Sequence, residues 1–136
     1  MTRRLLHHED GFSLMELLVV LLILAVLAAI ALPLFLTEKS KGQDASAKSD
    51  ARALAGQVEV CQVTTTRYAD CESGDSALDD AGLPTSVSVE AVSGGYDVTS
   101  VSGSGNVFLI ERRKAKVTRS CSDAGTTRGG CNGGSW

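Results

Sequence analysis

The sequence predicts an α+β fold in which a long amino-terminal helix packs on a small antiparallel β-sheet head that carries disulfides. Three observations predict it. Residues 17–36 form an uncharged apolar run, residues 37–62 place apolar side chains at spacings of three and four, and residues 87–121 form short alternating segments separated by glycine-rich breaks. The first two patterns are typical of helices, and the third is typical of strands joined by tight turns.

The apolar run is long enough to cross a membrane. A helix from Phe12 to Leu36 would extend about 37 Å, against about 30 Å for the hydrocarbon core of a bilayer. Arg3 and Arg4 precede the run and favour a cytoplasmic amino terminus, although Lys39 and Lys41 follow it and weaken that bias. We therefore expect a single-pass segment with the carboxyl half outside the cytoplasm.

Glu16 places a carboxylate just inside this apolar run. An ionised side chain in a membrane span costs roughly 2.5 to 3.5 kcal/mol on insertion scales, so such a residue is a functional candidate with a partner. Residues 17–36 contain no basic residue. The partner is therefore expected to come from a chain end or from another molecule.

Gly11, Phe12 and Glu16 together resemble the processing motif of bacterial type IV prepilins and the related pseudopilins. The resemblance implies that a membrane peptidase cleaves between Gly11 and Phe12 and methylates the new amino terminus on Phe12. It also implies that Glu16 pairs with the amino terminus of a neighbouring subunit during assembly. Pro33 matches the proline that many pilins carry late in this segment. The resemblance implies that the helix bends or melts there, and a mild kink is the simpler alternative.

A secretory signal peptide is the alternative for residues 1–31, because Ala29-Ile30-Ala31 is similar to a signal-peptidase site. Two features count against it. The apolar stretch is longer than the usual apolar region of about 7 to 15 residues, and Glu16 would be a charge inside its front edge.

Residues 37–62 are expected to continue the helix and to pack one stripe on the head. The stripe consists of Ala47, Ala51, Leu54, Ala55, Val58 and Cys61. The charged residues of this segment are expected to face water or a neighbouring subunit; they are Lys39, Lys41, Asp44, Lys48, Asp50 and Arg52.

The head is expected to contain a one-turn helix at residues 76–81 and then a three- or four-stranded antiparallel meander. The predicted strands are residues 87–92, 96–101, 107–112 and about 115–121. The resemblance implies the same architecture, since pilin heads have a meander packed on the long helix.

All four cysteines follow the apolar run, which predicts disulfides and an oxidising compartment. Cys61 and Cys71 are ten residues apart, as are Cys121 and Cys131. We favour these two local pairs, and crossed pairing remains open because four cysteines allow three connectivities. The tail, with Cys131, Gly133, Gly134 and Trp136, resembles pilins from actinobacteria, as does Glu9-Asp10 before the cleavage site.

Catalysis, cofactors and metals are not expected. The only histidines, His7 and His8, lie in the presumed leader, so the mature chain has none for a nucleophile pair or a zinc site. The net charge of −3 does not indicate binding to nucleic acid. An acidic cluster is a weak candidate for calcium and is more simply a solvated loop; it comprises Glu72, Asp75, Asp79 and Asp80.

We therefore expect four segments: a cleaved leader (1–11), a membrane and filament-core helix (12–36), an amphipathic helix (37–62) and a disulfide-bonded head (63–136). The predicted function is a type IV pilus subunit that leaves the cytoplasmic membrane and polymerises into an extracellular helical filament. Its expected partners are further copies, other pilins, the prepilin peptidase/methyltransferase and the assembly platform. The alternatives are a type II secretion pseudopilin and a signal-anchored binding domain that never polymerises.

Overall fold

A computed structural model of the 136-residue chain describes residues 11–74, 78, 82, 84–122, 130–131 and 133–136. The chain divides into two units, residues 1–35 and 36–136. Helix α1 (Leu14–Thr65) begins in the first unit and continues into the second, and the short 3-10 helix η1 (Tyr68–Asp70) follows it. The predicted one-turn helix at residues 76–81 lies outside the described residues, apart from Leu78.

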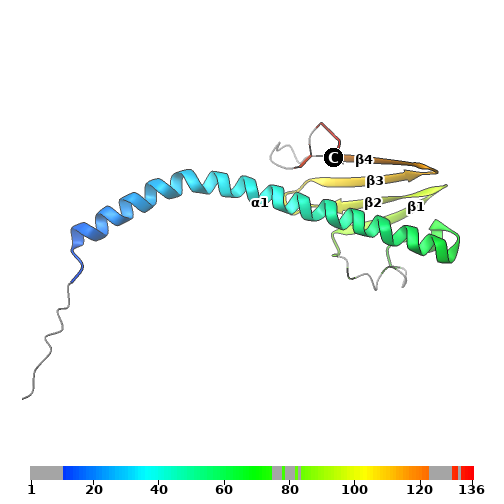
Figure 1. Cartoon of the computed structure of the whole chain (residues 1–136), viewed down its shortest axis with the longest axis horizontal. Coiled ribbons are helices and arrows are strands. Elements are labelled where there is room, and N and C mark those ends of the chain that lie inside the picture. The colour runs from blue at the N-terminus through cyan, green and yellow to red at the C-terminus, as the bar shows by residue number, and fades with distance from the viewer. Residues whose placement is uncertain (1–10, 75–77, 79–81, 83, 123–129, 132) are drawn as a thin grey trace, which may run out of the picture. The chain divides into compact units, whose positions relative to one another are not determined.

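The second unit contains a four-stranded antiparallel sheet in the order β1-β2-β3-β4. Its strands are β1 (Val87–Val92), β2 (Gly95–Val101), β3 (Val107–Arg113) and β4 (Lys116–Ser122). Figure 1 shows them side by side, following one another as a meander. The predicted strands are confirmed to within about one residue at each end, because hydrophobic alternation and turn residues mark both ends of each strand.

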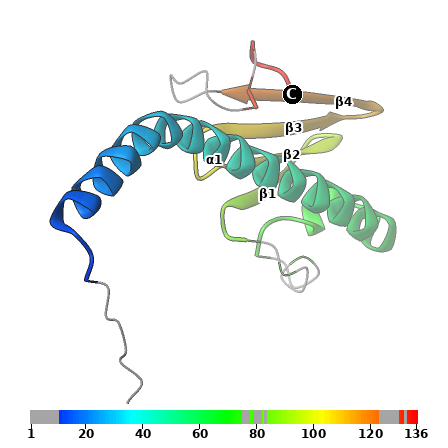
Figure 2. The same ribbon diagram turned by 60° about the vertical axis from the view of Figure 1, so that its left-hand side comes forward.

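The core lies between one face of the sheet and the second part of α1 (Figure 2). The helix contributes a stripe in which Ala51 and Val58 are fully buried, and the sheet contributes Val98, Phe108 and Ile110. The predicted helix stripe is confirmed, although Ala55 is only partly buried. Side chains three and four residues apart lie on the same helix face, which explains the success of the pattern.

Phe108 and Trp136 belong to a second part of the core. Phe108 packs with Ala47 and Cys131, and the Trp136 ring meets the Phe108 ring edge-on with centroids 5.6 Å apart. The Trp136 indole nitrogen donates a hydrogen bond to the Ser120 carbonyl at 2.8 Å. Trp136 therefore anchors the tail beside β4.

Candidate assembly site

The processing-motif residues lie at the start of α1. Gly11 and Phe12 precede the helix, and the Phe12 side chain is 72% exposed. The backbone N–H of Glu16 donates a hydrogen bond to the Ser13 carbonyl at 3.0 Å, so Glu16 belongs to the first helical turn. A carboxylate in the first turn is favoured by the helix dipole. Glu16 thus has a local stabilising role that sequence analysis did not consider.

The apolar surface of this part of α1 is exposed throughout. Every residue from Gly11 to Leu36 is exposed in the single chain, apolar side chains included. The helix is long and apolar enough to cross a membrane by length and composition. Contiguous apolar surface of this extent marks a contact with lipid or with other proteins.

Glu16 and Pro33 are two residues of α1 with predicted roles in assembly. Glu16 forms no ion pair within the part of the chain that the structure describes, so its predicted pairing with a neighbouring amino terminus remains a prediction. Pro33 lies inside α1, and helical residues continue on both sides of it. The predicted bending there also remains a prediction.

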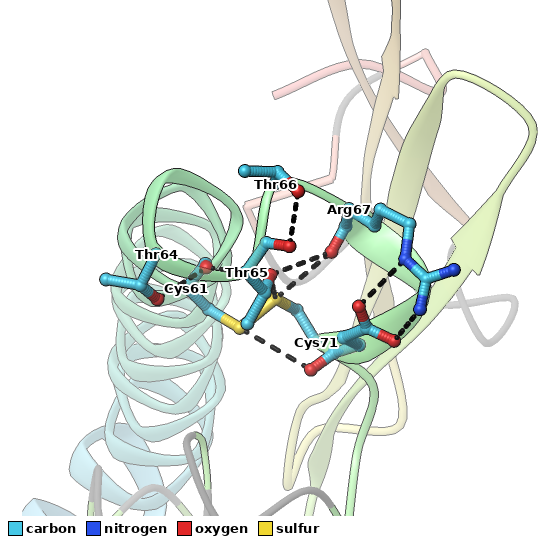
Figure 3. The surroundings of a disulfide bond; sticks show 7 residues. Cys61, Thr64, Thr65, Thr66, Arg67 and Cys71 are labelled. Carbon is cyan, nitrogen blue, oxygen red and sulfur yellow. Dashed lines mark hydrogen bonds and ion pairs between the residues drawn. A yellow bond between two sulfur atoms is a disulfide. The ribbon is translucent and has the colours of Figure 1, made fainter.

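The first disulfide ties the end of α1 to η1. Cys61 and Cys71 are joined, with 6.0 Å between their Cα atoms. Figure 3 shows the threonines that surround this bond: the hydroxyls of Thr64 and Thr65 donate to the Cys61 carbonyl at 2.8 and 2.9 Å. These hydroxyls bond back to a carbonyl of their own helix, three and four residues earlier, close to the disulfide.

The second disulfide ties the tail to β4. Cys121 and Cys131 are joined, with 5.7 Å between their Cα atoms. The Cys121 N–H also donates to the Gly134 carbonyl at 3.0 Å. The structure therefore contains the two local pairs that the sequence favoured rather than crossed pairs.

Asp44 is the residue that sequence analysis placed wrongly. It was expected to face water or a neighbour, but it is fully buried and accepts hydrogen bonds from distant residues that the structure describes. Two come from the β2–β3 turn, where Asn106 Nδ2 lies 2.8 Å from Oδ2 and the Ser104 hydroxyl contacts Oδ1. The third comes from the Gly130 N–H at 2.7 Å. Burial acts to raise the pKa of Asp44, but the hydrogen bonds outweigh it and lower that pKa overall.

Lys48 is also only partly exposed, contrary to expectation. Its amine donates to the Gly130 carbonyl and lies 5.0 Å from the centre of the Phe108 ring. Asp44 and Lys48 are four residues apart on α1, so they hold both backbone groups of Gly130. The sequence predicts a glycine-rich break between the strands at 96–101 and 107–112, but no local pattern indicates that this break pairs with a helix carboxylate.

The sequence predicts no metal site. Among the described residues, no group of three or more metal-binding side chains comes together. In the acidic cluster, Glu72 accepts a hydrogen bond from the Ala91 N–H at 3.2 Å. Asp75, Asp79 and Asp80 lie outside the described residues.

Comparison with known proteins identifies the amino-terminal segment. Residues 6–32 match the family model described as the prokaryotic N-terminal methylation motif. No solved structure gave a significant match.

The curated relatives are all secretion-system proteins. The type II secretion system core protein G of Dickeya chrysanthemi is 38% identical over 70 residues, or 52% of this chain and 46% of the relative. The corresponding proteins of Klebsiella pneumoniae (34% identical, 54% of this chain and 52% of the relative) and Pseudomonas aeruginosa (30% identical, 52% and 49%) are also similar.

The chain spans about half the length of the curated relatives it matches. These relatives favour the pseudopilin alternative over the extracellular pilus subunit that the sequence analysis preferred. The chain therefore carries the amino-terminal motif of type IV pilin-like proteins and is homologous, over about half of its length, to the core protein G pseudopilins of type II secretion systems.

Proposed function

We propose that this protein is a structural subunit of a type II secretion pseudopilus, held in the cytoplasmic membrane by α1 and then assembled through α1 with further copies. The observation that carries the proposal is the combination of the methylation motif at residues 6–32 with relatives that are all core protein G. The exposed apolar surface of residues 14–36 supports it, because only a membrane or neighbouring helices would bury that surface.

In this proposal, residues 1–11 are a leader that is removed between Gly11 and Phe12. Cleavage frees the Phe12 amino group, which is then methylated. Phe12 comes just before the first turn of α1 and Glu16 lies in that turn, so the freed amino group of one subunit would meet the Glu16 carboxylate of the next near the start of the helix. Oppositely charged groups that meet in an apolar environment attract strongly, which gives the filament its register.

The chemistry of the described residues supports a structural role over an enzymatic one. The two disulfides and the Asp44 hydrogen bonds fix the head to the helix, and each of these side chains is used in cross-linking the chain. Pro33 is proposed as the place where α1 adapts when subunits pack.

A type IV pilus subunit is the second candidate. The observation that favours it is the disulfide-bonded tail with Trp136, which resembles actinobacterial pilins and lies in a chain that aligns with core protein G over only about half its length. The two candidates share processing and helix assembly. They differ in where the filament is found.

The test of processing and assembly is the Glu16→Ala variant of the full chain, beside the wild type and a Glu38→Ala control on an exposed part of α1. We expect Glu16→Ala to be cleaved at Phe12, as intact mass shows, but to lose cross-linkable oligomers. The Glu38→Ala control should assemble normally. Normal oligomer yield from Glu16→Ala, or a mature chain that starts elsewhere than Phe12, would contradict the proposal.

Localisation separates the two candidates. Electron microscopy of labelled cells should find this chain in short envelope-bound assemblies if it is a pseudopilin. Long surface filaments at native expression would instead support the pilus subunit.

A further inference from the structure

The groove between α1 and the β3–β4 edge is lined by three arginines. Arg52 comes from the helix, Arg112 from β3 and Arg119 from β4, around a cavity of about 310 Å³. We call Arg52, Arg112 and Arg119 the arginine groove. Among the described residues that line it, one carries a carboxylate, Glu59.

The Glu59 carboxylate already has partners within its own chain. Its Oε1 atom lies 3.0 Å from Arg112 Nε and accepts a hydrogen bond from the Tyr96 hydroxyl at 3.0 Å. Its Oε2 atom accepts from the Tyr68 hydroxyl at 3.3 Å. Glu59 therefore compensates Arg112, and both of its oxygens have partners within the chain.

The guanidinium groups of Arg52 and Arg119 lie near an aromatic ring. Their guanidinium carbons lie 4.9 and 5.9 Å from the centre of the Trp136 ring. Neither forms an ion pair with any residue that the structure describes. Both are exposed, so two cations beside Trp136 are open to a ligand from outside.

The opposite face of the same sheet carries a row of carboxylates. Glu90 on β1 pairs in register with Asp97 on β2, which pairs in register with Glu111 on β3. We call Glu90, Asp97 and Glu111 the carboxylate row. Like charges directly opposite one another on paired strands repel and require compensation.

Arg113 compensates part of the negative charge of the carboxylate row. Arg113 contacts Asp97 Oδ2 at 2.8 Å and Glu111 at 3.6 Å, and Lys116 lies opposite Arg113 at the hairpin end. Glu90, at the β1 end, is exposed and has no cation partner among the described residues. The uncompensated negative charge therefore lies toward β1.

We propose that the arginine groove of one copy binds the carboxylate row of a second copy, with Arg52 and Arg119 facing Glu90 and its neighbours. The two surfaces lie on opposite faces of one sheet, because Arg112 and Arg119 alternate with Glu111 and the other outward residues. Such a contact joins two different surfaces head-to-tail, the kind of contact that builds an open filament when the rotation between copies does not close a ring. This inference rests on the proposed function and adds to it an interface between heads, separate from Glu16.

The test is a charge swap in the full chain, produced with its processing and assembly machinery. Arg52→Glu with Arg119→Glu places acids in the groove, and Glu90→Lys with Glu111→Lys places bases in the row. Each pair alone brings like charges together, and we expect the yield of cross-linked oligomers to fall at least roughly tenfold. The four substitutions combined restore opposite charges and should recover most of the yield. Glu38→Lys, a reversal on exposed helix, is the matched control and should assemble normally.

Folding is checked in every variant by the protection of both disulfides from alkylation without reductant. Wild-type yield from either charge-reversed pair would overturn the inference. The inference would also be overturned if the combined variant keeps its disulfides but does not recover the yield of cross-linked oligomers. That result is expected if the arginine groove binds an acidic partner other than a second copy. Assembly that still requires Glu16 in these cases would leave the proposed function standing. A wild type that forms no oligomers would overturn both.

Discussion

The Asp44→Ala substitution is expected to be the most destabilising change of a single charged side chain in the second unit, residues 36–136. Asp44 is fully buried and accepts hydrogen bonds from Ser104, Asn106 and the Gly130 N–H. Each buried donor that loses its partner costs about 1 to 3 kcal/mol, and the Ser104 hydroxyl can turn to Ser102. We therefore expect a loss of roughly 3 to 5 kcal/mol in the free energy of unfolding, a large fraction of the stability of a small domain.

The measurement is urea unfolding of the full chain in detergent, followed by the fluorescence of Trp136. Trp136 is the only tryptophan and packs on Phe108, so its emission reports the head. Glu38→Ala removes an exposed carboxylate from the same helix and should cost less than about 1 kcal/mol. The reasoning is refuted if Asp44→Ala unfolds within about 1 kcal/mol of this control.

Three further outcomes are expected. Hydrogen bonds lower the pKa of folded Asp44 below its ordinary 3.8. They therefore stabilise the folded chain above pH 3.8, and this stabilisation is lost as the pH falls through the folded pKa. In urea titrations between about pH 5 and about pH 2, Asp44→Asn should lose less free energy of unfolding than the wild type. Replacing Cys61 and Cys71 by serine opens a loop of sequence separation 10 and should lower the free energy of unfolding by roughly 2 to 3 kcal/mol, and an unchanged urea midpoint would contradict this. Thr66 has a φ of 68°, which is unfavourable for a branched residue, so Thr66→Gly should raise the free energy of unfolding by about 1 kcal/mol, whereas a lower thermal midpoint would show that the threonine is needed there.

Local patterns were sufficient for the secondary structure. The strand ends follow from hydrophobic alternation and from turn residues such as Gly94, whose φ of 77° suits a tight hairpin. The helix stripe follows from spacing alone. The local disulfides were favoured because each joins residues close in sequence, where little chain must be closed.

Local patterns failed where two distant segments meet. Asp44 and Gly130 are 86 residues apart, and Asp44 and Asn106 are 62 apart. In sequence, Asp44 is one charge among several on a polar helix segment, and nothing nearby marks it as buried. A carboxylate is stable inside a protein only when donors surround it, and those donors come from a turn and a tail that the fold brings together.

The sequence by itself determined the apolar helix, the processing motif with Glu16 and the meander, because each depends on residues within a few positions of one another. It favoured the local disulfides but left crossed pairing open, and the structure decided between them. Tertiary structure alone decided that Asp44 faces inward, that Trp136 holds Arg52 and Arg119, and that carboxylates form a row across three strands. Those features depend on strand register and on how the helix lies across the sheet, which no short segment specifies.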